Sequence, residues 1–297
     1  MRLVRFVAAD GRRTWGRLGA DGTIVEEPRG ALRRRELLDV LTLPPEALAG
    51  EIDAAGCDEH EGEAVQLLAP VERPSKVIGV GRNYREHAAE RGAAEPTSPI
   101  LFGILPSAVT GPSDDIVLPS LSKQIDWEGE LGVVIGRRTK GIARRDVEDH
   151  IAGYIALNDV TARDLQKLDG QWTRAKSFDT FKPTGPCLTT VDELGLAREL
   201  RIEVVVNGVR KQHASTAQMI FPVDELVSFV AAFCTLLPGD VIATGTPSGV
   251  GAAASPPNFL MSGDVLETRV EGIGALANRV VASPSFTTQS TDEATHV

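Results

Sequence analysis

Short stretches of alternating apolar and polar residues run through most of the chain, and they predict strands rather than long helices. The first stretch covers residues 1–28, where two Asp-Gly pairs separate alternating segments, so a small antiparallel meander is predicted. Residues 32–41 and 45–49 have the pattern of short helices, and residues 66–74 read as a connecting segment. We therefore place a domain boundary near residue 70.

From Lys76 onward, short strand patterns separated by Gly, Pro and Asp predict a mainly β domain. The clearest helix lies between Pro222 and Leu237, where an apolar stripe recurs at helical spacing and is expected to face the core, or the core plus a subunit interface. Residues 284–297 are polar without periodicity, which predicts a disordered tail. The expected organisation is a small N-terminal α+β domain (1–70), a larger domain (71–283) and this tail.

One predicted strand, at residues 121–136, carries acids on one face. Asp126, Glu128 and Glu130 alternate with apolar residues, so their carboxylates are neighbours on the same side. Carboxylates this close repel one another, and a hard divalent cation such as Mg²⁺, Mn²⁺ or Ca²⁺ would convert the repulsion into coordination. The alternative interpretation is an amphipathic strand whose acids face solvent.

A second acidic position follows the apolar run that begins at residue 153. Asp159 lies at the end of this predicted strand, where a buried acid is costly unless it is paired, protonated or bound to a metal. It is a candidate third oxygen ligand. The alternative is that Asp159 or Thr161 caps a helix starting near Ala162, and capping is the preferred interpretation for Thr161 and Asp164.

A histidine and a glutamate share a face of a further predicted helix, which covers residues 82–90 and ends at Gly92. His87 and Glu90 are three residues apart, so their side chains can touch. A carboxylate beside an imidazole orients the ring and stabilises its protonated form, which suits a general base. The alternative is an ordinary surface contact.

Composition narrows the class of protein. The formal net charge of −10 argues against nucleic acid as a partner, and an anionic substrate would need local attraction from a metal or basic groups. Hydrophobic residues make up 42% of the chain, yet no apolar run approaches the length of a membrane helix. The 3 cysteines are scattered, as in a reducing compartment. We expect a cytoplasmic protein.

Several blocks in order resemble the fumarylacetoacetate hydrolase family, from about Lys76 to Val280. They are VIGVGRNYREHAAE, DWEGELGVVIG, NDVTARDLQ, WTRAKSFDTFKPTGP, VNG, TGTPSGVG and SGDVLETRVEGIGALANRV. The resemblance implies an α+β, mainly β fold, in which residues 71–283 form the mixed β-sandwich roll that carries the catalytic site.

The resemblance also implies roles for individual residues. It implies that Glu128, Glu130 and Asp159 hold a divalent metal, most simply Mg²⁺ with Mn²⁺ or Ca²⁺ as alternatives, and that Asp126 is structural. It further implies that the catalytic residues include His87 with Glu90, which would activate water, and Lys176, expected in a loop, which would bind a substrate oxygen. Further substrate-binding candidates are Arg82, Tyr84, Gln166 and Thr246.

Two glycine-containing segments need separate interpretation. Residues 244–251, TGTPSGVG, lack the Gly-Lys-Ser/Thr ending of a P-loop, so they are not a nucleotide site. Their backbone amides and the Thr246 hydroxyl can cradle a carboxylate, or the segment is simply a tight turn. Residues 79–81 form a lone Gly-x-Gly, which is no signal for a dinucleotide site.

The sequence therefore predicts a metal-dependent hydrolase that cleaves a carbon–carbon bond in an acylpyruvate-like 2-oxo acid, acting as a homodimer. Alternatives are an isomerase or decarboxylase of unsaturated, hydroxymuconate-type 2-oxo diacids, or a catalytically silent metabolite-binding protein. One departure bears on substrate choice: many family members carry a lysine where this chain has Ile104.

Overall fold

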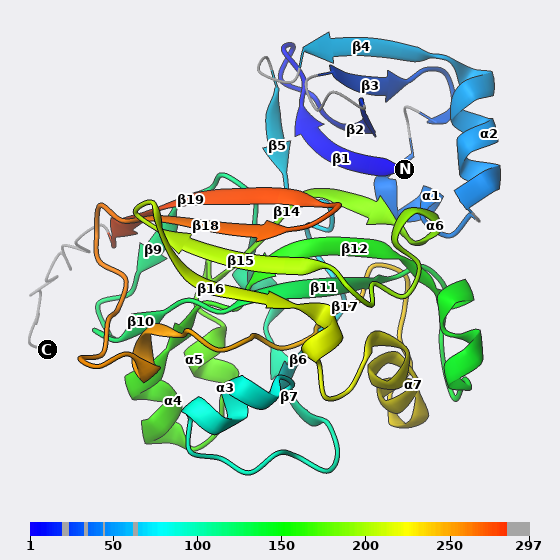
Figure 1. Ribbon diagram of the computed structural model, residues 1–297. Helices are drawn as coiled ribbons and strands as arrows, with labels where there is room; N and C mark the ends of the chain where they lie inside the picture. The colour runs from blue at the N-terminus through cyan, green and yellow to red at the C-terminus, as the bar shows by residue number, and fades with distance from the viewer. Residues whose placement is uncertain (20–23, 33–34, 44, 62–64, 284–297) are drawn as a thin grey trace, which may run out of the picture.

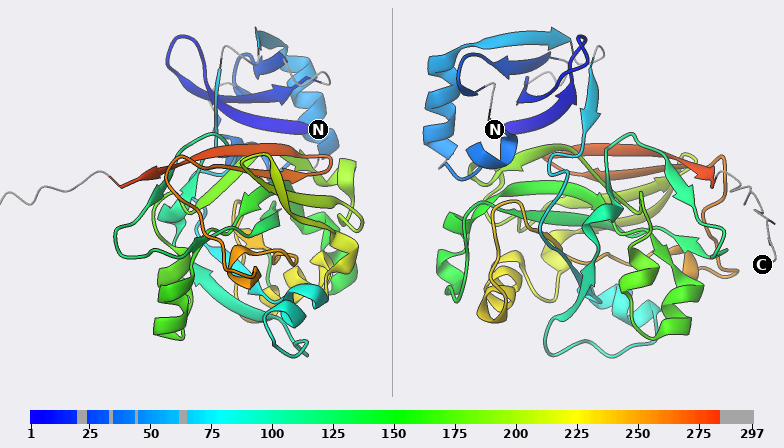
Figure 2. Two further views of the ribbon diagram at one scale, coloured as in Figure 1. Left: turned by 60° about the vertical axis from the view of Figure 1, so that its left-hand side comes forward. Right: turned by 180° about the vertical axis from the view of Figure 1, so that it is seen from behind.

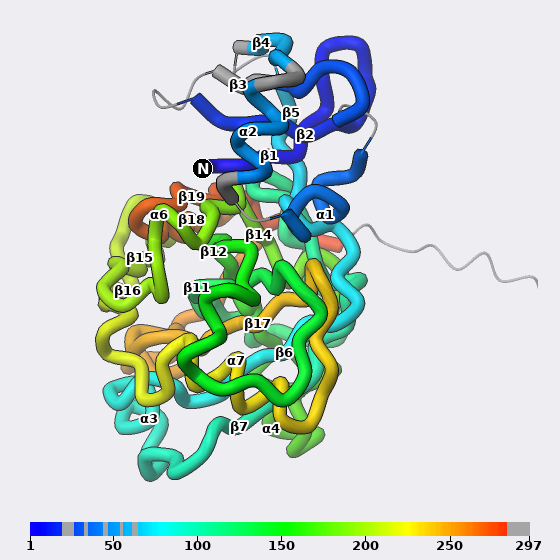
Figure 3. The backbone as a smooth tube through the Cα atoms, turned by 90° about the vertical axis from the view of Figure 1, so that its right-hand side faces the viewer, coloured from blue at the N-terminus to red at the C-terminus, as the bar shows by residue number. Residues whose placement is uncertain are grey.

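A computed structural model describes residues 1–19, 24–32, 35–43, 45–61 and 65–283. The predicted C-terminal tail lies outside these residues. The described strands form a 12-stranded sheet, a 5-stranded sheet and a two-stranded pair, and a smaller N-terminal unit sits at one end of the larger body in each view (Figures 1, 2 and 3). No helix in this described part of the chain is long and apolar enough to cross a membrane.

The N-terminal unit is the predicted antiparallel meander with helices beside it. Its strands are β1 (Arg2–Val7), β2 (Arg13–Leu18), β3 (Ile24–Pro28), β4 (Cys57–Glu61) and β5 (Gln66–Leu68). Helix α1 covers only Leu37–Val40, which is shorter than the predicted 32–41, whereas α2 (Pro45–Ala55) is longer than the predicted 45–49. Strand β1 also pairs with β14 of the larger body, so one sheet runs through both units. The domain boundary near residue 70 stays a prediction.

In the larger body that sheet continues in the order β14 (Lys182–Thr190), β12 (Ile151–Asn158), β11 (Gly129–Ile135), β17 (Val241–Ala243), β6 (Val77–Gly81) and β7 (Ile100–Ile104). The second sheet has the order β16 (Val209–Ser215), β15 (Arg201–Val206), β18 (Val265–Val270), β19 (Gly274–Ala282) and β9 (Ile116–Leu118). Three shorter strands are β8 (Val109–Thr110), β10 (Ile125–Asp126) and β13 (Thr161–Ala162). The fold is mainly β, as predicted.

Five α-helices and five 3₁₀ turns complete the described part of the larger body. The helices are α3 (Arg85–Glu90), α4 (Arg163–Asp169), α5 (Thr173–Lys176), α6 (Val191–Leu194) and α7 (Val223–Phe233). The 3₁₀ turns are η3 (Pro106–Ala108), η4 (Arg144–Asp146), η5 (Glu148–His150), η6 (Thr216–Gln218) and η7 (Gly251–Ala253). Helix α7 ends at Phe233, before the predicted Leu237, because Cys234 adopts an extended conformation.

The core between the two sheets explains why the acid-bearing strand is apolar around its acids. Leu131, Val133 and Ile135 of β11 pack in one core cluster with Ile202 of β15 and residues of β18 and β19. All seven residues of β11 are buried, as expected for a central strand covered on both faces. The predicted strand 121–136 is interrupted at Trp127 and Glu128, which separate β10 from β11.

Candidate active site

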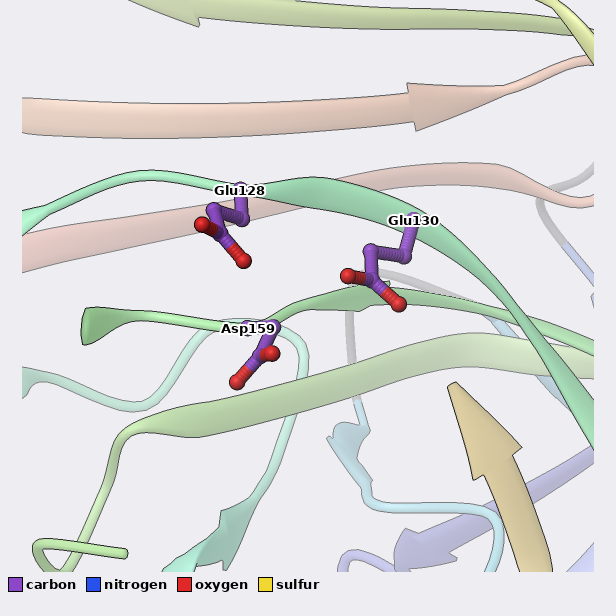
Figure 4. A group of neighbouring side chains, drawn as sticks. All are labelled: Glu128, Glu130 and Asp159. Atoms are coloured by element: carbon purple, nitrogen blue, oxygen red, sulfur yellow. The ribbon is translucent and has the colours of Figure 1, made fainter. Parts of the chain in front are cut away.

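Three carboxylates converge where β11 and β12 meet. Glu128 precedes β11, Glu130 lies within it, and Asp159 follows β12; ligand atoms of the three lie within 4.8 Å of one another (Figure 4). Antiparallel pairing produces this meeting, since Gly129 faces Asn158 and the Asp159 amide donates to the Glu128 carbonyl at 2.7 Å. Glu128 is 5% exposed and Glu130 1%, so the interpretation of a solvent-facing acidic strand is wrong.

Three buried cations accompany the acids. Arg163 Nη2 lies 2.6 Å from Glu128 Oε1, and Lys176 Nζ lies 2.7 Å from Glu128 Oε2 and 2.5 Å from Asp159 Oδ2. Lys182 Nζ lies 2.8 Å from Asp159 Oδ1. Burial alone would raise the pKa of Glu128, but Arg163 and then Lys176 outweigh it and hold this pKa well below its ordinary value. Burial lowers the pKa of Lys182 to about 8, although Asp159 partly offsets this.

Glu130 differs from the other two acids because no cation of the described residues lies within ion-pair distance of it. Its Oε2 accepts a hydrogen bond from the Gly245 amide at 2.8 Å. Burial, followed by repulsion from Asp159 and Glu128, raises the pKa of Glu130 well above its ordinary value. An unpaired carboxylate facing two others fits a hard divalent cation, so these three residues could hold one.

The predicted dyad is formed on α3. His87 Nδ1 lies 2.8 Å from Glu90 Oε1, while Glu90 Oε2 accepts from the Gly249 amide at 3.0 Å. His87 is only 6% exposed and its ring lines a cavity, so the dyad is not an ordinary surface contact. With Nδ1 held by the carboxylate, Nε2 is the ring nitrogen left for chemistry in that cavity.

The backbone amides of the glycine-rich segment 244–251 donate hydrogen bonds to carboxylates of the protein itself. Three of its amides donate to three different acids: Gly245 to Glu130 (2.8 Å), Gly249 to Glu90 (3.0 Å) and Gly251 to Asp126 (2.7 Å). Gly245 has φ +97°, and a Cβ there would lie 2.7 Å from the Cβ of Asn83, so glycine is required. These three amides are therefore not free to cradle a substrate carboxylate. The Thr246 hydroxyl donates to the Gly129 carbonyl at 3.0 Å, and Thr246 also lines the cavity.

The cavity has a volume of about 430 Å³ and gathers most of the predicted site residues. Of those, the lining includes His87, Glu128, Lys176, Arg82, Gln166 and Thr246. It also includes residues that sequence reasoning missed: Arg91, Gln124, Arg163, Lys167, Trp172 and Phe259. Arg163 stands directly after the NDVTA segment and Arg91 directly after Glu90, and this proximity to predicted site residues was the signal that could have identified them. Nothing in the sequence says which acids they face.

Other predicted residues are placed differently. Tyr84 is not among the residues lining this cavity: it is 2% exposed, and burial first, then Glu130, raises the pKa of its hydroxyl. Lys176 belongs to helix α5, not to a loop as predicted. Thr161 does not cap α4, because its hydroxyl donates to the Asp159 carbonyl at 2.7 Å. Asp164 is not the N-cap residue of α4, which is Ala162, although its carboxylate accepts from the Leu165 amide in the first turn at 2.9 Å and from the Ser122 hydroxyl.

Asp126 and Ile104 also have clear placements. Asp126 is fully buried and accepts from Arg163 Nε at 2.8 Å, which fits the structural role expected for it. Ile104, at the position where many family members carry lysine, packs in an apolar core cluster and is not part of the cavity lining.

One wall of the cavity is built on a strand whose glycines leave room for aromatic rings. A Cβ on Gly79 would lie 2.1 Å from the Phe102 ring, and one on Gly81 would lie 2.4 Å from the Trp172 ring. The two rings pack edge to face with centroids 5.2 Å apart, and Lys176 Nζ lies 5.0 Å from the Phe102 centroid. The Gly-x-Gly of β6 therefore serves ring packing in this site.

The mixed β-sandwich roll, the buried acids Glu128, Glu130 and Asp159 and the His87–Glu90 dyad together indicate one enzyme family. The chain belongs to the fumarylacetoacetate hydrolase family, whose model, "Fumarylacetoacetate (FAA) hydrolase C-terminal", matches residues 76–281. It is 40% identical over 293 residues to a mitochondrial oxaloacetate tautomerase of Xenopus laevis, covering 95% of this chain and 90% of that protein. A mitochondrial oxaloacetate tautomerase of Homo sapiens is 45% identical over 219 residues, 73% of this chain and 70% of that protein.

Solved structures of the family superpose over nearly the whole chain. A fumarylacetoacetate hydrolase from the psychrophile Exiguobacterium antarcticum has a TM-score of 0.85 at 37% identity, covering 95% of this chain and 100% of that chain. A 5-carboxymethyl-2-hydroxymuconate delta-isomerase from Mycobacterium smegmatis has a TM-score of 0.78 at 35% identity, with coverage of 95% and 100%.

Proposed function

We propose that this chain is a divalent-metal-dependent isomerase that interconverts the enol and keto forms of a 2-oxo dicarboxylate, with oxaloacetate as the leading candidate. The observation that carries the proposal is that one cavity is lined by His87 of the dyad, by Glu128 of the acidic triad and by Lys176. The tautomerases that share 40% and 45% identity with the chain support this reaction over hydrolysis.

Glu128, Glu130 and Asp159 would hold the cation, for which Mg²⁺ is our proposal and Mn²⁺ or Ca²⁺ are alternatives. When bound, such a cation would act as a Lewis acid that favours the enolate form of a 2-oxo acid.

The residues around the cation would move one proton between the enol oxygen and C3 of the substrate. In the enol-to-keto direction the enol oxygen loses its proton and C3 gains one, so the composition of the substrate does not change. His87, oriented by Glu90, would carry the proton at C3, because its ring lines the cavity and its Nδ1 is held at 2.8 Å by the carboxylate. Lys176 would stabilise the oxygen at C2, and Arg82, Gln166 and Thr246 would contact the rest of the substrate.

The test is the loss of the ultraviolet absorbance of enol-oxaloacetate, followed with Mg²⁺ and with chelator. Metal-dependent acceleration over the spontaneous rate is the expected result. Acceleration that survives chelator and Glu128→Gln unchanged would contradict the metal assignment, and no acceleration at all would reject the tautomerase.

Hydrolysis of an acylpyruvate is the second candidate, because a fumarylacetoacetate hydrolase superposes with a TM-score of 0.85. In that reaction His87 and Glu90 would take a proton from water, and the water would attack the carbonyl remote from the 2-oxo acid. A panel of acylpyruvates, oxaloacetate and hydroxymuconate-type diacids separates the candidates, since only hydrolysis gives two fragments with water incorporated, while a decarboxylase would release carbon dioxide. Turnover of any of these substrates would exclude the alternative that the chain is a catalytically silent metabolite-binding protein.

Cellular location and assembly are also part of the proposal. A cytoplasmic homodimer stays a prediction, and the animal tautomerases similar to this chain are described as mitochondrial.

A further inference from the structure

The charged groups of the cavity fall into two sets. The inner set is a buried network that reaches the cavity lining through Glu128, Arg163 and Lys176. Its ion pairs are Arg163 with Asp126 and Glu128, Lys176 with Glu128 and Asp159, and Lys182 with Asp159, whereas Glu130 has no ion pair among the described residues. The outer set consists of cations alone, namely Arg82, Arg91 and Lys167. Within the described residues, none of the three outer cations forms an ion pair, although all line the same cavity. Although the protein has a net charge of −10, these three residues therefore give this cavity a set of positive charges without ion-pair partners.

Among the three outer cations, Arg91 is the one next to the helix that carries the His87–Glu90 dyad. It follows Glu90 directly and ends helix α3, so the helix that positions the dyad also positions this guanidinium. Arg91 and Arg163 line the same cavity, and partial desolvation, followed by the positive charge of Arg163, lowers the pKa of the Arg91 guanidinium from its ordinary value. Lys167 reaches the same cavity from α4.

We propose that Arg91, assisted by Lys167, binds the second carboxylate of a dicarboxylate whose 2-oxo end lies at the acidic triad, and that this contact selects dicarboxylates over monocarboxylates. The inference rests on the proposed function, because it assumes the orientation of substrate given there. A guanidinium suits this task since its planar donors match a carboxylate in two parallel hydrogen bonds. The 2-oxo end engages the inner set, so the outer cations act on binding and not on the proton transfer.

The experiment compares two inert ligands that differ only at C3: malate, whose C3 carries the second carboxylate, and lactate, which has a hydrogen in place of that carboxylate. Affinities are measured by calorimetry in Mg²⁺ for the wild type, Arg91→Gln and Arg85→Gln. Arg85 is the matched control, because it lies on the same helix, pairs with Glu95 at 3.3 Å and does not line this cavity.

Arg91→Gln should weaken malate binding about tenfold, the scale of a charge-assisted hydrogen-bond pair at a partly exposed site, and leave lactate unchanged. With oxaloacetate, KM should rise by a similar factor while kcat stays constant. Arg85→Gln should change neither ligand. Equal affinity of the wild type for malate and lactate, or an equal effect of Arg91→Gln on both, overturns the inference. A preserved malate preference without any tautomerisation would instead reject the proposed function and leave the inference standing.

Discussion

Replacing Glu90 with glutamine tests the dyad with almost no change in side-chain volume. In the wild type both carboxylate oxygens accept hydrogen bonds, one facing His87 Nδ1 at 2.8 Å and the other taking the Gly249 amide at 3.0 Å. A glutamine side chain has a single acceptor oxygen. If that oxygen stays with Gly249, the amide nitrogen faces Nδ1 and forces the ring proton onto Nε2, the nitrogen that faces the chemistry.

The expected loss of rate follows from these contacts. The charge-assisted hydrogen bond between Glu90 and His87 is worth about 1.5–3 kcal/mol. The Glu90 side chain is only 20% exposed, so water screens this interaction little. That range corresponds to about a ten- to hundredfold fall in kcat. Deleting the imidazole with His87→Ala should cost about a hundredfold or more, the usual scale for a lost general base. Glu90→Gln should therefore approach His87→Ala without exceeding it.

Steady-state kinetics on enol-oxaloacetate measures both variants, and Glu86→Gln is the matched control. Glu86 lies on the same helix and is exposed, and among the described residues its carboxylate accepts only from the Ser248 hydroxyl, at 3.1 Å, so its variant should retain full activity. Wild-type kcat in both Glu90→Gln and His87→Ala would refute the assignment of proton transfer to the dyad. A rise in KM at constant kcat would show that the dyad only binds substrate.

Further predictions concern the acidic triad and assembly. Burial and neighbouring acids raise the pKa of Glu130 above its ordinary value of 4.5. Without metal, the protonated carboxyl therefore contributes stability to the fold, and this contribution is lost as the pH rises above 4.5. In chelator, the melting temperature of the wild type relative to Glu130→Gln should therefore fall with rising pH, and a flat difference would contradict this. Calorimetry should show that Glu130→Gln weakens Mg²⁺ binding, and unchanged affinity would exclude it as a ligand. Helix α7 leaves Phe229 and Phe233 exposed, so light scattering should report about twice 31.7 kDa, whereas a monomer mass would reject the homodimer.

The sequence predicted those parts of the site that depend on local periodicity. Alternation placed Glu128 and Glu130 on one side of the chain, and helical spacing brought His87 to Glu90, because both relations are fixed within a few residues. Strand boundaries were less accurate: the break at Trp127 interrupts an otherwise regular alternation, and local pattern carries no signal for it.

The partners of these groups could not be predicted, because they are set by contacts between distant segments. Arg163 reaches Asp126 from 37 positions away, and the Gly249 amide reaches Glu90 from 159. The same applies to Lys182, since the sequence shows a lysine beside a proline but not the buried acid it will face. The sequence thus predicted the acids, the dyad and Lys176 as candidate site residues, but it did not predict Arg163 and Lys182 as the cations that face the buried acids.

The three glycine amides that hold Glu130, Glu90 and Asp126 also make the site observable by hydrogen exchange. They belong to one short segment, 244–251, yet each reports on a different carboxylate. An amide exchanges with solvent deuterium only when its hydrogen bond opens, so exchange at these positions measures how often each carboxylate is released. Because a single stretch of backbone binds all three, an opening of the segment would release Glu130 of the acidic triad, Glu90 of the dyad and Asp126 together, so these three carboxylates would be freed as one cooperative unit rather than residue by residue.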